Sequence, residues 1–80
     1  MRPIKRSLTI AGHRTSISLE PEFWDALREV AAAQGLTVAA LVARVDESRA
    51  AAGDQEAGGL SAALRVHVLL QYQSQARQPR

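Results

Sequence analysis

Residues His13–Trp24 read HRTSISLEPEFW, and the spacing of their apolar side chains changes abruptly at Pro21. Up to Leu19 apolar and polar residues alternate one by one, which is the period of a β-strand with one buried face. After Pro21 the apolar residues return every three or four positions, as in an amphipathic helix. Pro21 suits the first helical position, where its missing N–H has no intrahelical partner. This stretch therefore predicts a strand that leads directly into a helix.

The chain before this strand is basic and contains a second alternating piece. Residues 1–6 are expected to form a disordered basic arm, and the first fourteen residues carry no acidic side chain but five basic ones, Arg2, Lys5, Arg6, His13 and Arg14. Such a segment is typical either of a nucleic-acid contact or of a solvated tail. From Ser7 to Ile10 the alternation is out of phase with that of residues 14–19. The break at residues 11–13 is either a bulge or a tight turn.

Two helices are expected after the strand. The first runs to about Gln34, with an apolar stripe at Phe23, Trp24, Leu27, Val30 and Ala31. Gly35 is placed to end it in the left-handed conformation, and Thr37 to cap a second helix over residues 38–51. The stripe of this second helix is Val38, Leu41, Val42 and Val45. The short connection predicts an αα-hairpin.

The remaining residues suggest a linker and a third helix. Residues 53–60 are polar and rich in glycine, Ser61 is placed to cap a helix over residues 61–73, and residues 74–80 are expected to be a flexible tail. Apolar residues project to nearly all sides of this helix: Leu64, Val66, Val68, Leu69, Leu70 and Tyr72. A helix that is apolar all round is normally buried, so a partner subunit is expected to cover its far side.

Length and composition point to association with another chain. An 80-residue chain forms at most one domain and buries a modest share of its surface. It has no cysteine and two histidines, so neither a disulfide nor a metal site is expected to stabilise it. No apolar run approaches the roughly 20 residues of a membrane span, and no signal peptide is evident. We therefore expect a soluble, cytoplasmic oligomer.

A lone strand with one apolar face can pair with the same strand of a second copy. The two strands would form an antiparallel ribbon about a two-fold axis, with Ile17 and Leu19 facing the helices. The opposite face would carry Arg14, Ser16 and Ser18. The major groove of DNA is wide enough for such a two-stranded ribbon.

Residues 14–49 resemble the ribbon-helix-helix superfamily of DNA-binding proteins, which includes the methionine and Arc repressors. The matching pieces are the strand RTSISLEPEF, the helix EFWDALREVAAAQ, the GLT turn and the helix VAALVARVDESR. The resemblance implies a mainly α fold with a short β-strand, in an intertwined homodimer with an intermolecular antiparallel β-ribbon. It leaves the third helix as an addition to a core over residues 7–52. The segment LSAALRVHVLLQY also resembles the family's second helix, although GLTVAALVAR follows the first helix at the expected turn.

The resemblance also implies roles for particular residues. Arg14, Ser16 and Ser18 match the base-reading positions, and Arg14 is the strongest because a guanidinium can bond guanine O6 and N7 together. Thr37 and Val38 match the helix start that rests on a phosphate. Arg2, Lys5 and Arg6 could add phosphate contacts. The expected dimer core is Ile17, Leu19, Trp24, Leu27, Leu41 and Val45.

The expected function is therefore binding and not catalysis. No set of residues has the spacing of a nucleophile with its base, of a phosphate loop or of a metal site, so neither an enzyme nor a cofactor is expected. The leading hypothesis is a sequence-specific transcriptional regulator, a repressor in its simplest form, that binds double-stranded DNA. One alternative is an adaptor or antitoxin-like protein that binds a protein partner through the third helix. Another is a nonspecific architectural DNA binder.

Overall fold

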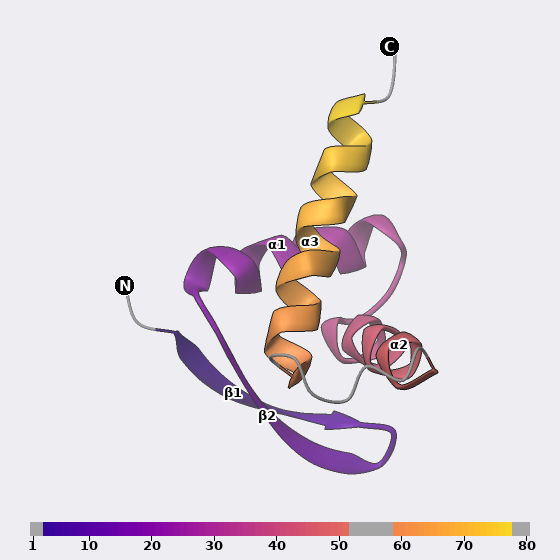
Figure 1. Ribbon diagram of the computed structural model, residues 1–80. Coiled ribbons are helices and arrows are strands. Elements are labelled where there is room, and N and C mark those ends of the chain that lie inside the picture. The colour runs from indigo at the N-terminus through magenta and orange to yellow at the C-terminus, as the bar shows by residue number, and fades with distance from the viewer. Residues whose placement is uncertain (1–2, 52–58, 78–80) are drawn as a thin grey trace.

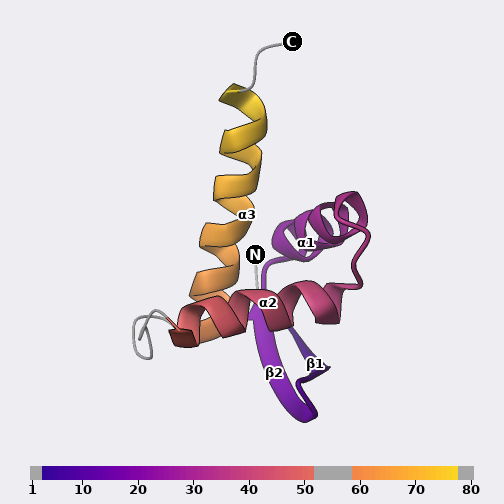
Figure 2. The same cartoon turned by 90° about the vertical axis from the view of Figure 1, so that its right-hand side faces the viewer.

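The computed structural model describes residues 3–51 and 59–77. A two-stranded antiparallel sheet lies at one end of the molecule, and three helices pack on one of its faces (Figures 1 and 2). The elements in chain order are β1 (Ile4–Ile10), β2 (His13–Leu19), α1 (Pro21–Ala33), α2 (Val38–Ala51) and α3 (Gly59–Arg77). The strand-to-helix change at Pro21 and the three helices confirm the predicted fold class.

Strands β1 and β2 form a hairpin within the chain. Ile4 pairs with Leu19 and Ile10 with His13, so β2 has a partner strand that does not come from a second copy. Residues 4–6, which were expected in a disordered arm, belong to β1 because this register pairs them with the end of β2. Within residues 3–51 and 59–77 no other strand pairs with the edge of β2 that faces away from β1, and an edge of this kind can pair with a strand of a second copy.

The hairpin turn resolves the alternative between a bulge and a tight turn. Ala11 and Gly12 form a two-residue connection, and both have positive φ, 51° and 83°. Positive φ at both central positions is the mark of a type I′ turn, whose twist suits a hairpin. In this register even-numbered residues of β1 pair with odd-numbered residues of β2. The apparent phase change in the sequence therefore places both apolar sets on the same face of the sheet.

Helix α1 ends as the sequence predicts. Gly35 has φ 69°, the N–H of Leu36 donates to Ala31 O at 2.8 Å, and the N–H of Gly35 donates to Ala32 O at 3.1 Å. This pair of bonds is a Schellman motif, in which glycine is favoured because the left-handed conformation has no Cβ penalty. Leu36 then packs against the core.

Helix α2 begins with the predicted cap. Thr37 Oγ1 accepts a hydrogen bond from the N–H of Ala40 at 3.0 Å, so it satisfies one of the donors that a helix start leaves open. The helix covers residues 38–51, as expected, and is bent by 94° relative to α1. Among the described residues no single helix is long and apolar enough to cross a membrane, and α1 and α2 reach that length only as this bent pair.

Helix α3 differs from the prediction at both ends. It begins at Gly59 and extends to Arg77, so Ser61 lies inside the first turn and is not the N-cap. The predicted linker over residues 53–60 lies mostly outside the described residues, and Gly59 and Leu60 belong to the helix. Residues 74–77, expected in a flexible tail, continue the helix, whereas residues 78–80 are not described.

One core joins the sheet to all three helices. Ile17, Leu19 and Leu27 are 0–1% exposed, and Leu64 of α3 is fully buried beside them. All six residues that were expected in a dimer core are buried within a single chain: Ile17, Leu19, Trp24, Leu27, Leu41 and Val45. Their burial therefore does not require a partner, and a contribution to a dimer stays a prediction.

Candidate nucleic-acid interface

The hairpin has a polar face that points away from the helices. Side chains directly opposite each other in the ladder share a face, and three successive pairs here are polar. These pairs are Lys5 with Ser18, Ser7 with Ser16, and Thr9 with Arg14. Five of the six residues are exposed, and Ser18 is half-buried. The alternate pairs, which include Ile4 with Leu19 and Ile10 with His13, lie on the helix side.

The charge of this polar face is uniformly positive. Lys5 and Arg14 are its charged groups, and neither strand contains a carboxylate. In the described part of the chain no hydrogen bond or ion pair engages the side chains of the six residues. Two cations and four hydroxyl groups are therefore presented to solvent on a two-stranded ribbon. Such groups can donate to phosphates and to base edges.

The predicted base-reading residues lie together on this polar face. Arg14, Ser16 and Ser18 follow one another along β2 at alternate positions, as expected. The sequence interpretation missed Ser7 and Thr9, which complete the face from β1. Their alternation with Leu8 and Ile10 was visible, but their place opposite Ser16 and Arg14 depends on the two-residue turn.

The predicted phosphate-contacting residues are dispersed. Lys5 lies on the polar face, whereas Arg6 lies on the other side of β1, with its guanidinium carbon 5.5 Å from the centroid of the Trp24 ring. Arg2 lies outside the described residues. Thr37 and Val38 belong to the helical layer, so the structure does not place them on the face that carries Arg14.

The start of α2 keeps part of its capacity to bind an anion. The Thr37 hydroxyl is already bonded to the N–H of Ala40. The N–H groups of Val38 and Ala39 open the helix, and groups at these positions have no acceptor inside an α-helix. The positive end of the helix dipole lies at the same place.

An ion pair fixes the end of β2 against α3. Arg65 Nε donates to Glu20 Oε1 at 2.9 Å and Arg65 Nη2 donates to Glu20 Oε2 at 3.2 Å, a forked arrangement that sets the orientation of both groups. The hydrogen bond from Arg65 holds the pKa of Glu20 below its ordinary value of 4.5. The guanidinium carbon of Arg65 also lies 5.9 Å from the centroid of the Phe23 ring. These contacts connect the residue that follows β2 to α3.

The described residues show no built metal site. Within residues 3–51 and 59–77 no group of three or more His, Cys, Asp or Glu side chains lies close enough to hold a metal ion. Asp46, one of the acidic residues of α2, accepts a hydrogen bond of 2.7 Å at its Oδ1 from Arg49 Nη2.

One solved structure is similar over almost the whole chain. An uncharacterized protein from Bordetella pertussis Tohama I matches 96% of this chain with 40% sequence identity and a TM-score of 0.73. This chain spans 62% of the length of that protein. No functionally curated protein matches the sequence.

A family model of the ribbon-helix-helix domain matches residues 3–72. The match includes the hairpin, α1, α2 and α3 as far as Tyr72. Most of α3, which was expected to be an addition to a core over residues 7–52, therefore lies inside the matched domain. The chain belongs to the ribbon-helix-helix domain family, whose fold is a DNA-binding one.

Proposed function

We propose that this protein is a homodimeric, sequence-specific transcriptional regulator that inserts its β-ribbon into the major groove of double-stranded DNA. The observation that carries the proposal is the cationic face of Lys5, Ser7, Thr9, Arg14, Ser16 and Ser18 on a two-stranded ribbon free of carboxylates. A ribbon of this width fits the major groove, where each base pair presents a distinct set of donors and acceptors. Repression by covering a promoter is the simplest use of such binding. The proposed location of the protein is the cytoplasm.

The side chains divide into base-reading and phosphate-contacting groups. Arg14 is the main base-reading residue, because it is the one guanidinium on this face and can bond guanine in a bidentate manner. Ser16 and Ser18 would add contacts that tolerate several bases. Lys5 lies at the far end of the same face and would contact a phosphate. The N–H groups of Val38 and Ala39 would bind a second phosphate at the start of α2.

A dimer would double this surface. Pairing of the free β2 edge with β2 of a second copy would give an antiparallel ribbon with the two hairpins joined in one sheet. A two-fold dimer fits a palindromic operator, since the symmetry of the site then mirrors that of the protein. In this arrangement the joined sheet has four strands, and its central pair, β2 of each copy, is the two-stranded ribbon that would enter the groove, with one β1 strand at each edge.

A titration by fluorescence anisotropy tests the proposal. The labelled duplex is the DNA upstream of the protein's own gene, the competitor is a scrambled duplex, and both are measured at low and at near-physiological salt. The expected result is tighter binding to the native duplex at both salt concentrations. Equal binding to both duplexes that disappears with salt would indicate an architectural DNA binder, and no binding at all would contradict the proposal.

A pair of variants locates the binding face. Arg14→Ala is expected to lose about 1–3 kcal/mol of binding free energy and to relax the sequence preference, with the fold intact. Arg28→Ala is the matched control, since it removes an exposed arginine from α1 that is paired with Asp25. Equal losses in the two variants would show that Arg14 acts only through net charge.

The competing proposal is an adaptor or antitoxin-like protein that binds a different protein through α3. It is favoured by the exposed apolar side chains of that helix, Val66, Leu69, Leu70 and Tyr72. It predicts that the isolated protein binds a hydrophobic dye strongly and loses that signal when its protein partner is added.

A further inference from the structure

Helix α3 is apolar on two opposite sides. Leu64 and Val68 are buried against the rest of the chain, with 0% and 4% exposure. Val66, Leu69 and Leu70 lie on the other side and are 53–55% exposed. Three large aliphatic side chains on one helix face form a ridge, which we call the α3 ridge. Its exposure in a chain with one small core marks it as an interaction surface.

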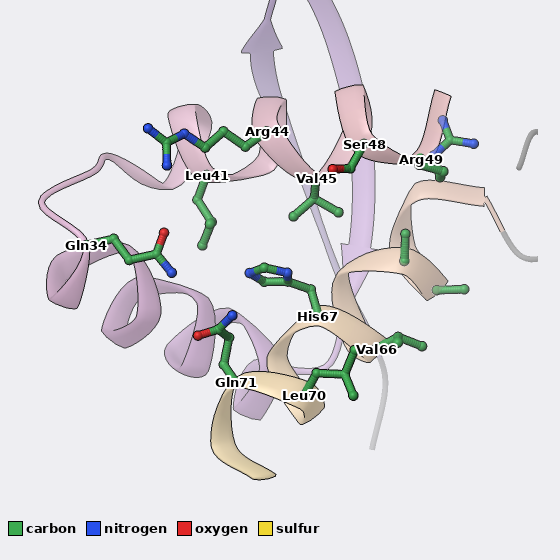
Figure 3. A pocket seen from close by; sticks show the side chains of 12 residues that line it. Gln34, Leu41, Arg44, Val45, Ser48, Arg49, Val66, His67, Leu70 and Gln71 are labelled. Carbon is green, nitrogen blue, oxygen red and sulfur yellow. The ribbon is translucent and has the colours of Figure 1, made fainter. Parts of the chain in front are cut away.

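A groove flanks the α3 ridge on each side. The groove between α1 and α3 has a volume of about 420 Å³, and its apolar lining includes Phe23 and Ala26 of α1 and Tyr72 of α3. The groove between α2 and α3 has a volume of about 600 Å³ and is seen in Figure 3. His67 points into this second groove, and its Nε2 atom is buried without a hydrogen-bond partner in the described part of the chain. Val66 lines both grooves, so the ridge separates them.

The two flanks of the α3 ridge differ in charge. Arg44 and Arg49 lie along the groove on the α2 side, whose lining contains no carboxylate. Arg49 is paired with Asp46, so Arg44 carries most of the positive charge of this flank. Glu22 lies along the groove on the α1 side. Glu29 is also beside α3 on that side, because Tyr72 Oη donates to its Oε1 at 2.6 Å. Arg65, the basic residue of the α1 side, is already paired with Glu20. One flank is therefore basic and the other acidic.

We infer that the α3 ridge and the groove between α1 and α3 are the interface between two copies of this chain, related by a two-fold axis that runs along α3. A ridge beside an apolar groove is self-complementary, since the ridge of each copy can enter the groove of the other. The ridge alone exposes on the order of a few hundred Å², whereas a stable interface needs about 800 Å² from each partner. The walls of the flanking grooves supply the remaining contact area.

Charge decides the direction of the axis. With an axis along α3 the two helices are parallel, and the basic α2 flank of one copy meets the acidic α1 flank of the other. An axis across α3 would make the helices antiparallel and would place the two basic flanks opposite each other, which is unfavourable. The parallel arrangement is therefore the complementary one.

The same axis suits the proposed DNA-binding face, and in this respect the inference rests on the proposed function. The hairpin lies at the end of α3 where the helix begins, and the other end of α3 extends away from the sheet (Figures 1 and 2). Parallel α3 helices therefore bring both hairpins to the same end of the dimer. Their polar faces can then meet one duplex.

Single-cysteine variants test the orientation directly, because the natural chain has no cysteine. Leu69→Cys and Ala76→Cys place thiols on the same side of α3, two helical turns apart. In a parallel pair each residue lies next to the same residue of the second chain. Both variants are therefore expected to form a disulfide-linked dimer under mild oxidation. In an antiparallel pair at most one of them can do so. Gln75→Cys is the control, because residue 75 is exposed on a different side of α3 from Leu69 and Ala76. This variant is expected to run as a monomer on a non-reducing gel.

Sedimentation velocity without DNA tests the interface itself. The wild type is expected to be a dimer at micromolar concentration, and Leu69→Glu is expected to weaken the dimer by more than about tenfold because it buries a charge in the interface. Gln75→Glu adds the same charge elsewhere on α3 and should leave the dimer unchanged. Circular dichroism checks that both variants fold, which the 53% exposure of Leu69 favours.

Each outcome has a distinct meaning. A wild type that stays monomeric and binds a hydrophobic dye would overturn the inference and favour a different protein partner on α3. A dimer that is insensitive to Leu69→Glu, or that crosslinks at only one cysteine position, would also overturn it. DNA is absent from these measurements, so they test the interface independently of DNA binding. A dimer that depends on Leu69 but does not bind DNA would contradict the proposed function and still support the interface.

Discussion

The indole N–H of Trp24 donates a hydrogen bond of 2.9 Å to the carbonyl oxygen of Ile4, the first residue of β1. Trp24 is 2% exposed and lies on α1, so a buried side chain of the first helix holds the beginning of the first strand. The Arg6 guanidinium lies over the same ring. These contacts explain why residues with the composition of a flexible basic arm form part of the sheet.

Replacing Trp24 by phenylalanine is expected to loosen β1. The variant keeps an aromatic ring in the core but leaves the carbonyl of Ile4 without its donor, which costs about 1–3 kcal/mol of unfolding free energy. Urea unfolding measures this loss, and amide hydrogen exchange should show faster exchange in β1 than in α2. Tyr72→Phe is the control, because it also removes one donor from an aromatic residue but at a 38% exposed site. Equal exchange rates in β1 of the wild type and Trp24→Phe would contradict this role.

The helices were predictable because their signals are local. Pro21, Gly35 and Thr37 each act within a few residues of their own positions, through a fixed φ, a left-handed turn and a capping bond. The start of α3 was less predictable, since Ser61 looked like a cap but the helix begins before it at Gly59.

The hairpin was not predictable to the same degree because its register joins residues far apart in the sequence. Ile4 pairs with Leu19, and this pairing depends on the turn at Ala11 and on a side chain of α1. For the candidate site, strict alternation along β2 was enough to place Arg14 and Ser16 on one face. The contribution of β1 to that face follows only from the register.

The turn of the hairpin contains a residue that glycine should improve. Ala11 has φ 51°, a left-handed conformation that is costly for a residue with a Cβ atom. Ala11→Gly is therefore expected to raise the unfolding free energy by about 0.5–1 kcal/mol. Gly12→Ala, at φ 83°, should lower it by about 1 kcal/mol or more, although no atom lies near the added Cβ. Thermal unfolding of the two variants checks the prediction, and destabilisation by Ala11→Gly would show that residue 11 does not adopt the left-handed conformation.

The pairing of Glu20 with Arg65 should make stability depend on pH in the acidic range. Because the hydrogen bond from Arg65 lowers the pKa of Glu20, the folded state favours the carboxylate. The contribution is full above the ordinary pKa of 4.5 and is lost as the pH falls through the lowered value. Glu20→Gln should therefore lower the melting temperature at pH 7, and its difference from the wild type should shrink as the pH falls below 4.5. A difference that stays constant down to that range would mean that the carboxylate charge is not involved.

Lys5 and Arg6 are adjacent basic residues on opposite faces of β1, and this contrast separates a phosphate contact from a general effect of charge. Lys5 lies on the polar face opposite Ser18, whereas Arg6 lies over the Trp24 ring. If Lys5 binds a phosphate, Lys5→Gln should reduce the slope of log K against log salt concentration by about 0.9. It should also weaken binding to the native and to the scrambled duplex by the same factor. Arg6→Gln should change this slope less, because the Arg6 guanidinium lies on the helix side of β1 and does not face the major groove of the DNA. Anisotropy titrations at several salt concentrations measure both slopes, and equal changes in the two variants would mean that the two faces of β1 are equivalent towards DNA.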